Sequence, residues 1–511
     1  MQSPEKQELI FRRILTVLSV AAAVMFATGA AVALWTTHGI TEVESIIAAQ
    51  ATALSSGGGL YYDLDRYPFT VSPYGPILYG LEALGVLLHL PPLTVGRVVS
   101  LLALGGVIFL VNRLLRLYTK NPYTVWTGTL MTAASANLVS WGSLGQSDML
   151  GLLFSVAALE RYSTYRLKQA PGALLASAVF VAAAIFSKQS FIAAGATISI
   201  LFLMENPRGG LRYVLGLGTV GVAIALTLNW ATSGGYWANA VIANLNPFAW
   251  HKLTDQLHYF VLTAGSLALV AVAGLAGGKF RRIHPFALYL ALSTIVFLAT
   301  SPKIGSDLNY QIETVTALTL CAALALERLN FFPLLFADSK RWITLLQLPV
   351  LLYIALNCAV TGKVALQRIG NDLLRQDQFQ ALAPYLSLPG RIVSVEIDPL
   401  LHSGRPIEVE PLIFTMVADA GMSDPTPVLE DLEAREFSVV ILYEDLFDND
   451  RSKLRLGTPT LPDAHLDVMK ANYSLVDHLP GPFVGGLYIY TPNQEHAALT
   501  QLTYSPQVIP Q

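Results

Sequence analysis

Charged residues are scarce in this chain. Only 13% of its 511 residues are Asp, Glu, Lys or Arg, whereas a soluble domain carries about 25%. In contrast, 53% of the residues are hydrophobic, and the mean hydropathy is +0.51. These values exclude an ordinary soluble domain and indicate an integral membrane protein. The net charge of −3 also argues against a nucleic-acid partner.

Cysteine is scarce as well. Cys321 and Cys358 both lie within apolar runs, so the sequence predicts no disulfide framework. It also lacks a P-loop, a nucleophile elbow and a dinucleotide-binding glycine motif. No internal repeat is apparent along the chain. These absences argue against nucleotide-dependent and serine-hydrolase chemistry.

Long apolar runs dominate the first two thirds of the chain. Eleven of them approach the length of a membrane-spanning helix: 14–36, 97–113, 122–141, 146–161, 171–187, 190–204, 213–231, 258–277, 284–300, 311–327 and 342–361. We interpret the first run as a retained helix rather than a cleaved signal peptide, because it is longer than a usual signal sequence.

The distribution of basic residues predicts the orientation of these helices. If the N-terminus is cytoplasmic, every cytoplasmic turn is basic, as the positive-inside rule requires. The N-terminus and these turns contain Lys6, Arg12, Arg13, Arg113, Arg116, Lys120, Arg161, Arg166, Lys168, Arg208, Arg212, Lys279, Arg281, Arg282, Arg328, Lys340 and Arg341. The outer turns contain single cations, namely Arg66, Arg97, Lys188, Lys252 and Lys303. Counting residues 74–90 as a further span would break this pattern, so we predict an amphipathic helix in the outer interface there.

The character of the chain changes after Thr361. Short β-rich runs at 391–397, 437–443 and 486–492 alternate with helical patterns at 409–421 and 464–473. The predicted fold is therefore an all-α polytopic membrane bundle of about eleven transmembrane helices, followed by a soluble α/β domain. The bundle covers residues 1–361 and includes an outer catalytic loop at 37–96. The α/β domain covers residues 362–511 and is expected outside the cytoplasm.

The segment from His38 to Gly75 is acidic, aromatic and interrupted by proline and glycine, so it is too polar to lie in lipid. Several short sequences occur in a characteristic order in and beyond it: GGLYYD at 58–63, YPFTVSPYGP at 67–76, Arg97 at the start of a span, LGQSDML at 144–150 and SPKIGSDLNYQIE at 301–313. In this order the chain resembles the GT-C superfamily of glycosyltransferases that use polyprenyl-phosphate sugars. The similarity is greatest to the protein O-mannosyltransferase and aminoarabinose transferase branch, glycosyltransferase family 39-like.

This resemblance implies a membrane glycosyltransferase that moves a sugar from a polyprenyl-phosphate donor to a hydroxyl on the outer face of the membrane. The acceptor could be a lipid, a glycan or a protein. Relatives often carry an adjacent Asp-Glu pair in the first outer loop, whereas this chain has Glu42 and Glu44 separated by Val43. The identity of the catalytic acid is therefore open.

A carboxylate is needed to take the proton from the attacking hydroxyl. Burial near apolar surface raises the pKa of such a group toward neutrality. We predict Glu44 for this role, with Glu42 and Asp63 as alternatives. The first two could instead form the solvated face of an interfacial helix. Asp63 and Asp65 form a D-x-D pattern that could hold a divalent metal ion, although a solvated turn is the favoured interpretation.

Other polar residues at the outer ends of the spans are candidates for binding the substrate. Cations there could stabilise the leaving phosphate, and Lys303 is favoured over Arg97, with Lys188 last. Snorkelling to lipid headgroups is the alternative for all three. The remaining candidates could contact the sugar or the acceptor: Asp148, Gln146, Asn309, Tyr310 and Tyr62. Asp148 could equally cap a helix, and Tyr62 could belong to an interfacial aromatic belt.

Two other functions were weighed. A lipid or solute transporter, or flippase, would favour internal repeats and ions at the midplane, and the acids here cluster in an outer loop instead. A membrane scaffold that presents the C-terminal domain is the third hypothesis. We expect a multi-pass protein of the cell (inner) membrane, surrounded by membrane lipids, with its N-terminus in the cytoplasm.

Overall fold

The structure is a computed structural model that describes residues 4–246, 248–276, 284–328, 342–448, 459–480 and 486–493. These residues divide into two compact units. The helical unit comprises Met1–Thr36, Tyr74–Leu226 and Asn246–Arg368. The sheet unit comprises Thr37–Pro73, Thr227–Leu245 and Ile369–Gln511. The sheet unit thus contains the first part of the predicted outer loop as well as the C-terminal region.

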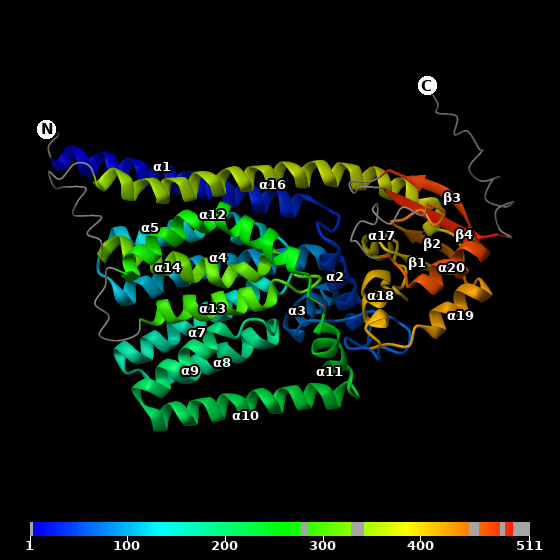
Figure 1. Cartoon of the computed structure of the whole chain (residues 1–511), viewed down its shortest axis with the longest axis horizontal. Coiled ribbons are helices and arrows are strands. Elements are labelled where there is room, and N and C mark those ends of the chain that lie inside the picture. Colours follow the sequence, from blue (N-terminus) through cyan, green and yellow to red (C-terminus); the bar gives the residue numbers. More distant parts are fainter. Residues whose placement is uncertain are drawn as a thin grey trace. The chain divides into compact units, whose positions relative to one another are not determined.

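The helical unit is a bundle of apolar helices whose axes are roughly aligned (Figure 1). Its elements are α1 (Pro4–Trp35), α3 (Pro76–Leu87), α4 (Pro92–Tyr118), α5 (Pro122–Ala133), α6 (Ala136–Gly142), α7 (Asp148–Lys168), α8 (Pro171–Ser187), α9 (Ala193–Glu205), α12 (Trp250–Ala276), α13 (Pro285–Thr300), the 3-10 turn η2 (Leu308–Gln311) and α14 (Ile312–Arg328), together with the larger parts of α10 (Pro207–Ala231) and α16 (Trp342–Leu386), whose last residues belong to the sheet unit. Proline opens α3, α4, α5, α8 and α13, where its missing N–H costs nothing because the first turn has no partner for that group.

Each predicted apolar run corresponds to one or two of these helices. Run 122–141 is divided between α5 and α6, because Ser135 caps a new helix by accepting a hydrogen bond from the N–H of Leu138. Within the described ranges, five helices are long and apolar enough to cross a membrane: Thr16–Trp35, Pro92–Tyr118, Pro207–Ala231, Trp250–Leu275 and Pro349–Leu386. These helices agree with the membrane protein that the composition predicts, and the count of eleven spans stays a prediction.

The predicted orientation also stays a prediction. The basic turns expected at 279–282 and at 340–341 lie outside the described residues. Part of the segment predicted as an interfacial helix at 74–90 forms α3. Exposed leucines lie in the C-terminal half of α3 and at its end, namely Leu84, Leu87 and Leu88.

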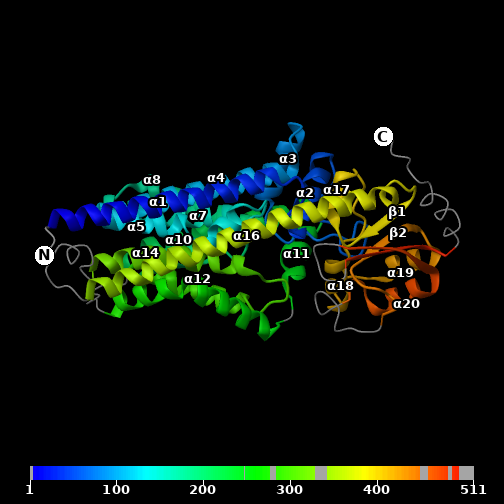
Figure 2. The ribbon, with the colours of Figure 1, turned by 90° about the horizontal axis from the view of Figure 1, so that it is seen from above.

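The sheet unit contains a four-stranded sheet of order β1-β2-β4-β3. Its strands are β1 (Arg391–Ser394), β2 (Phe437–Leu442), β3 (Tyr473–Leu479) and β4 (Leu487–Pro492). β1 and β2 are parallel, whereas β4 is antiparallel to both β2 and β3. Helices α17 (Ile397–His402), α18 (Pro411–Asp419), α19 (Thr426–Ala434) and α20 (Asp463–Asn472) accompany the sheet, and the unit also contains α2 (Glu42–Ser55), α11 (Gly235–Ala240) and η1 (Ile242–Asn244). Figure 2 shows α19 and α20 beside the strands from a second direction.

The sheet has buried residues on both faces, which explains why the predicted strands read as nearly continuous apolar runs. All six residues of β2 are buried. Phe69 of the first outer loop joins this core, and its backbone exchanges hydrogen bonds of 2.7 and 3.0 Å with Glu408 and Glu410. The predicted α/β character of the C-terminal region is thus confirmed. The boundary predicted at 361 falls inside the continuous helix α16 and stays a prediction.

Candidate functional site

A buried ion pair lies at the ends of two neighbouring helices of the helical unit. Asp148 is the first residue of α7, and Lys188 directly follows α8. The Lys188 Nζ lies 2.7 Å from Asp148 Oδ1, and the two side chains are only 5% and 1% exposed. An unpaired charge would be very costly at this depth, so each group requires the other in the absence of a ligand.

Two tyrosine rings complete the surroundings of this lysine. The Lys188 Nζ lies 4.9 Å from the ring centre of Tyr74 and 5.1 Å from that of Tyr310, which is within cation–π range. Burial raises the pKa of the Tyr74 hydroxyl to about 12, and the nearby lysine opposes part of that rise. We call Asp148, Lys188, Tyr74 and Tyr310 the lysine cluster.

The chain reaches this arrangement through a close approach at Gly75. A Cβ atom at this position would lie only 1.7 Å from the carbonyl oxygen of Phe186, near the end of α8. Only glycine therefore allows the Tyr74–Gly75 segment to pass so near the last turn of that helix. The close approach holds the Tyr74 ring beside Lys188.

The lysine cluster has an unused hydrogen-bond acceptor. Asp148 Oδ2 is buried and has no hydrogen-bond partner in the described part of the chain. The same is true of Asn309 Oδ1, in the η2 turn next to Tyr310. Buried acceptors without partners are uncommon in native proteins and often mark a site that a ligand or water completes. These two oxygens could receive hydrogen bonds from hydroxyl groups.

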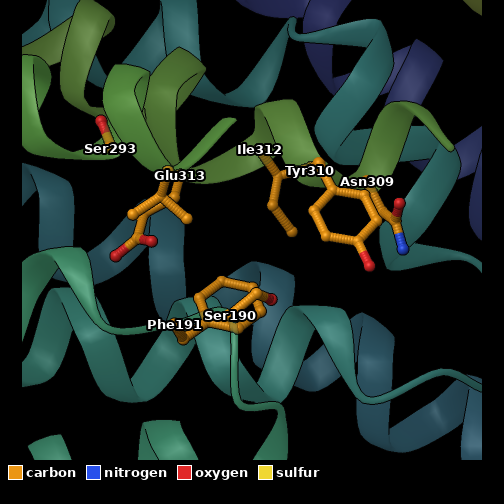
Figure 3. A pocket seen from close by; sticks show the side chains of 8 residues that line it. Ser190, Phe191, Ser293, Asn309, Tyr310, Ile312 and Glu313 are labelled. Atoms are coloured by element: carbon orange, nitrogen blue, oxygen red, sulfur yellow. The ribbon is translucent and has the colours of Figure 1, made fainter. Parts of the chain in front are cut away.

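A small cavity of about 10 Å³ adjoins the lysine cluster. Tyr310 and Asn309 line it together with Glu313, while Ser190 and Phe191 approach from the turn between α8 and α9 (Figure 3). The Glu313 carboxylate, 5% exposed, accepts a hydrogen bond of 3.1 Å from the hydroxyl of Tyr289. This volume is sufficient for about one water molecule, so the cavity itself is too small for a sugar.

The two cations that were favoured from the sequence have other contacts. Arg97, 1% exposed, donates a hydrogen bond of 2.9 Å to the carbonyl oxygen of Ala33 and a second one to that of Thr36. It therefore satisfies carbonyl groups at the C-terminal end of α1. Lys303 is half-buried in the turn after α13, and its backbone pairs with Phe248. Gln146 is buried, and its carbonyl oxygen accepts from the hydroxyl of Ser100.

In the sheet unit, Glu44 takes part in a helix cap. Thr41 is the N-cap of α2, and its side chain accepts from the N–H of Glu44. The Glu44 carboxylate in turn accepts a 2.8 Å hydrogen bond from the N–H of Ile40, and its side chain is buried. This is close to the reciprocal arrangement of a capping box. The catalytic role predicted for Glu44 stays a prediction beside this structural role.

Glu42, in the same helical turn, contacts the C-terminal region. The hydroxyl of Tyr443 contacts Glu42 Oε1, and it lies 2.8 Å from Glu396 Oε1. Burial raises the pKa of Glu410 well above its usual value, and the nearby negative charge of Glu42 raises it further. We call Glu42, Tyr443, Glu396 and Glu410 the carboxylate cluster.

The D-x-D pattern forms an exposed turn. Asp63 Oδ1 accepts from the N–H of Asp65, and its other oxygen lies 3.7 Å from Arg66. Asp65 accepts a 2.7 Å hydrogen bond from the N–H of Asp424. Tyr62 is half-buried, and its carbonyl oxygen accepts from Asn239. In the ranges described here, no three His, Cys, Asp or Glu side chains are grouped to hold a metal ion, so the divalent metal stays a prediction.

Sequence reasoning ranked Lys188 last and did not single out Tyr443, Glu396 or Glu410. For Lys188, the polar KQS interruption between two apolar runs was the available signal. For Glu396 and Tyr443, the signal was their place at the ends of the β-rich runs 391–397 and 437–443. Glu396 follows β1 and Tyr443 follows β2, and neighbouring parallel strands end at the same edge of a sheet.

Comparison with solved structures identifies the fold. No protein-family model matches the sequence, and no curated protein matches it. The crystal structure of ArnT from Cupriavidus metallidurans bound to undecaprenyl phosphate has a TM-score of 0.61 at 13% identity, covering 93% of this chain and 97% of that chain. The apo state of the same protein has a TM-score of 0.60 at 14% identity, with the same coverage.

The mycobacterial arabinofuranosyltransferase AftD has a TM-score of 0.51 at 16% identity. That match covers 93% of this chain and 41% of AftD. The chain therefore has the fold of ArnT and AftD. The fold expected from the sequence resemblance is thus confirmed.

Proposed function

We propose that this protein is a membrane glycosyltransferase that moves a sugar from a polyprenyl-phosphate donor to an acceptor hydroxyl on the outer face of the membrane. The shared fold supports this proposal, and so does the structure of ArnT with undecaprenyl phosphate. The observation within this chain that carries the proposal is the lysine cluster. It encloses a buried cation that is balanced by one acid and faced by two aromatic rings.

The reaction develops negative charge on the phosphate oxygen as the bond to the sugar breaks. A fixed cation near that oxygen lowers the barrier, and its effect is largest where water is excluded. Lys188 is the most completely buried of the Lys residues whose exposure the structure describes. In this proposal the ammonium of Lys188 binds the phosphate, while Asp148 keeps the lysine charged before the donor arrives.

The free acceptor oxygens have a complementary role in the proposal. Asp148 Oδ2 and Asn309 Oδ1 would accept hydrogen bonds from sugar hydroxyls and so orient the ring. A carboxylate of the first outer loop, Glu42, Glu44 or Asp63, would take the proton from the acceptor hydroxyl as that oxygen attacks the anomeric carbon. Direct displacement would invert the configuration at that carbon.

The proposed setting follows from the distribution of charges along the sequence. The protein would be a multi-pass component of the cell (inner) membrane with a cytoplasmic N-terminus and an extracytoplasmic C-terminal domain. The donor would enter laterally from the outer leaflet. A hexose or a pentose could be transferred, and the acceptor could be a lipid, a glycan or a protein.

The test is an assay of the purified full chain with a panel of polyprenyl-phosphate sugars. Transfer is measured as release of free polyprenyl phosphate together with a glycosylated acceptor. Lys188→Met is expected to lower turnover by about 100-fold or more, as loss of one charge-stabilising group does in other enzymes. The matched control is Lys252→Met in the first turn of α12, which should retain activity. A wild-type protein that releases no polyprenyl phosphate from any donor would contradict the proposal.

A further inference from the structure

The two hydrogen bonds of Tyr443 in the carboxylate cluster determine how many protons these groups share. The Tyr443 hydroxyl lies within hydrogen-bond distance of both Glu42 Oε1 and Glu396 Oε1. A phenol carries a single proton and can donate it to only one of these oxygens. The second contact therefore needs a proton on one of the two carboxyl groups, which then donates to the phenol oxygen. With both contacts made, the three groups hold two protons.

The geometry comes from three distant parts of the chain. Glu396 and Tyr443 follow the adjacent parallel strands β1 and β2, so both residues project from the same edge of the sheet. Glu42 is the first residue of α2, 401 positions before Tyr443. Tyr443 and Glu396 are 6% and 2% exposed, whereas Glu42 is half-buried. Tyr443 of the C-terminal region thus hydrogen-bonds to the Glu42 carboxylate, which remains partly accessible to solvent.

Other ionisable groups surround α2. Glu410, at the start of α18, is 5% exposed, and its Oε2 atom has no hydrogen-bond partner in the described part of the chain. Helix α17, which packs against α2, carries Asp398 and His402, and Asp398 accepts a hydrogen bond of 2.8 Å from the N–H of Gly39. From α16, Arg375 donates to the carbonyl oxygen of Gly39.

Glu42 and Glu44 differ in how their carboxylates are used. Glu44 is buried and accepts from the backbone of Ile40, so much of its bonding capacity serves the helix cap. Glu42 accepts from a side chain that is itself fixed by a second carboxyl group. A hydrogen bond from a neutral donor orients a carboxylate without removing its negative charge, which suits a group that must accept a proton.

We propose that Glu42 is the proton acceptor of the transfer reaction and that Tyr443 and Glu396 are positioning residues that hold it. This inference rests on the proposed function. In the reaction, the acceptor O–H bond breaks and its proton passes to Glu42. The acceptor oxygen bonds to the anomeric carbon, and the electron pair of the broken sugar–oxygen bond stays on the phosphate. The phenol proton of Tyr443 remains in place.

The test compares Tyr443→Phe with Tyr490→Phe in the full chain. Tyr490 is a matched control because it is a buried tyrosine of the same sheet, and its hydroxyl hydrogen-bonds to the backbone of Leu446 and Glu444. Tyr443→Phe removes a charge-assisted hydrogen bond. It is expected to lower kcat by about 10- to 100-fold with little change in KM, and to move the acidic limb of the pH–rate profile to higher pH. Tyr490→Phe should leave that limb in place.

Two further variants keep the inference testable if Tyr443→Phe folds poorly. Glu396→Leu cannot donate to the phenol oxygen of Tyr443, so the hydrogen bond from Tyr443 to Glu42 is weakened and the acidic limb should move to higher pH, as in Tyr443→Phe. The neutral donor of Glu396→Gln should leave that limb near its wild-type position. In a Glu42→Gln background, Glu396→Leu should cause no additional loss, because its effect acts through Glu42.

The possible failures are distinguishable. If the wild type transfers sugar but Tyr443→Phe and Glu396→Leu leave the pH profile unchanged, the inference is overturned and the proposed function stands. Additive losses in the Glu42→Gln background would overturn it as well. If the wild type transfers sugar from no donor, both the inference and the proposed function are refuted.

Discussion

The buried pair of Lys188 and Asp148 offers the sharpest test of structure against function. Two unit charges 2.7 Å apart attract by about 6 kcal/mol at an effective dielectric constant of about 20. Desolvation of both groups offsets part of this attraction. Breaking a buried pair by removing one partner nevertheless costs about 3–5 kcal/mol, because the remaining charge is left uncompensated.

We therefore expect Lys188→Met and Asp148→Asn each to lower the free energy of unfolding by about 3–5 kcal/mol. The double variant Lys188→Met/Asp148→Asn contains neither charge, so it should recover most of that loss. Thermal unfolding of the purified protein in detergent measures stability, and release of polyprenyl phosphate measures turnover on the same samples.

The two measurements separate a structural role from a catalytic one. If Lys188 binds the phosphate, the double variant is stable yet remains at least about 100-fold slower than the wild type. Lys188→Arg, which keeps the charge, should retain part of the activity. A double variant that regains both stability and turnover would refute the assignment of the phosphate to this lysine.

Three other changes have defined outcomes. Thr41→Ala removes the N-cap of α2 and should cost about 1 kcal/mol of stability in denaturant unfolding; an unchanged midpoint would contradict the cap. Gly75→Ala introduces a Cβ where the nearest backbone oxygen is 1.7 Å away, so a clear fall in melting temperature and in turnover is expected, whereas wild-type values would show that the approach is looser. The hydrogen bond to Asp398 raises the pKa of His402 to about 9. The pair of His402 and Asp398 therefore contributes its full stabilisation below about pH 6.5 and loses it as the pH rises through 9. The loss is no more than about 1 kcal/mol of the free energy of unfolding, because the His402 side chain is 41% exposed. The stability difference between the wild type and His402→Gln should shrink over that range, and a constant difference would contradict it.

Helices and strands were largely predictable because their signals are local. Each of the apolar runs is helical, and the three β-rich runs became β1, β2 and β4. Strand β3 was missed because Tyr473–Leu479 contains Asp477 and His478 and is mostly only half-buried, so no apolar run marks it. It is an edge strand held by pairing with β4, and such pairing cannot be read from the segment alone.

The candidate site was less predictable because burial separates similar residues. From the sequence, Lys188, Lys303 and Arg97 are all single cations near the outer ends of spans. In the structure, Arg97 binds backbone carbonyl groups at the end of α1, whereas Lys188 pairs with an acid and two aromatic rings. Lys303 was favoured for the polar residues that follow it, yet the ring of one of these, Tyr310, faces Lys188.

The assignment of the proton acceptor shows the same limit most clearly. Glu42 and Glu44 lie two positions apart, and the sequence prediction favoured Glu44, with Glu42 as an alternative. Their difference arises from Tyr443, which is 401 residues further along the chain and donates a hydrogen bond to Glu42. A helix turns by about 100° per residue, so two residues on, the side chain points in a very different direction. Glu44 therefore turns into the cap while Glu42 faces the end of β2. The choice of catalytic acid thus depends on the packing of α2 against the C-terminal sheet, and substitution at Tyr443 tests it directly.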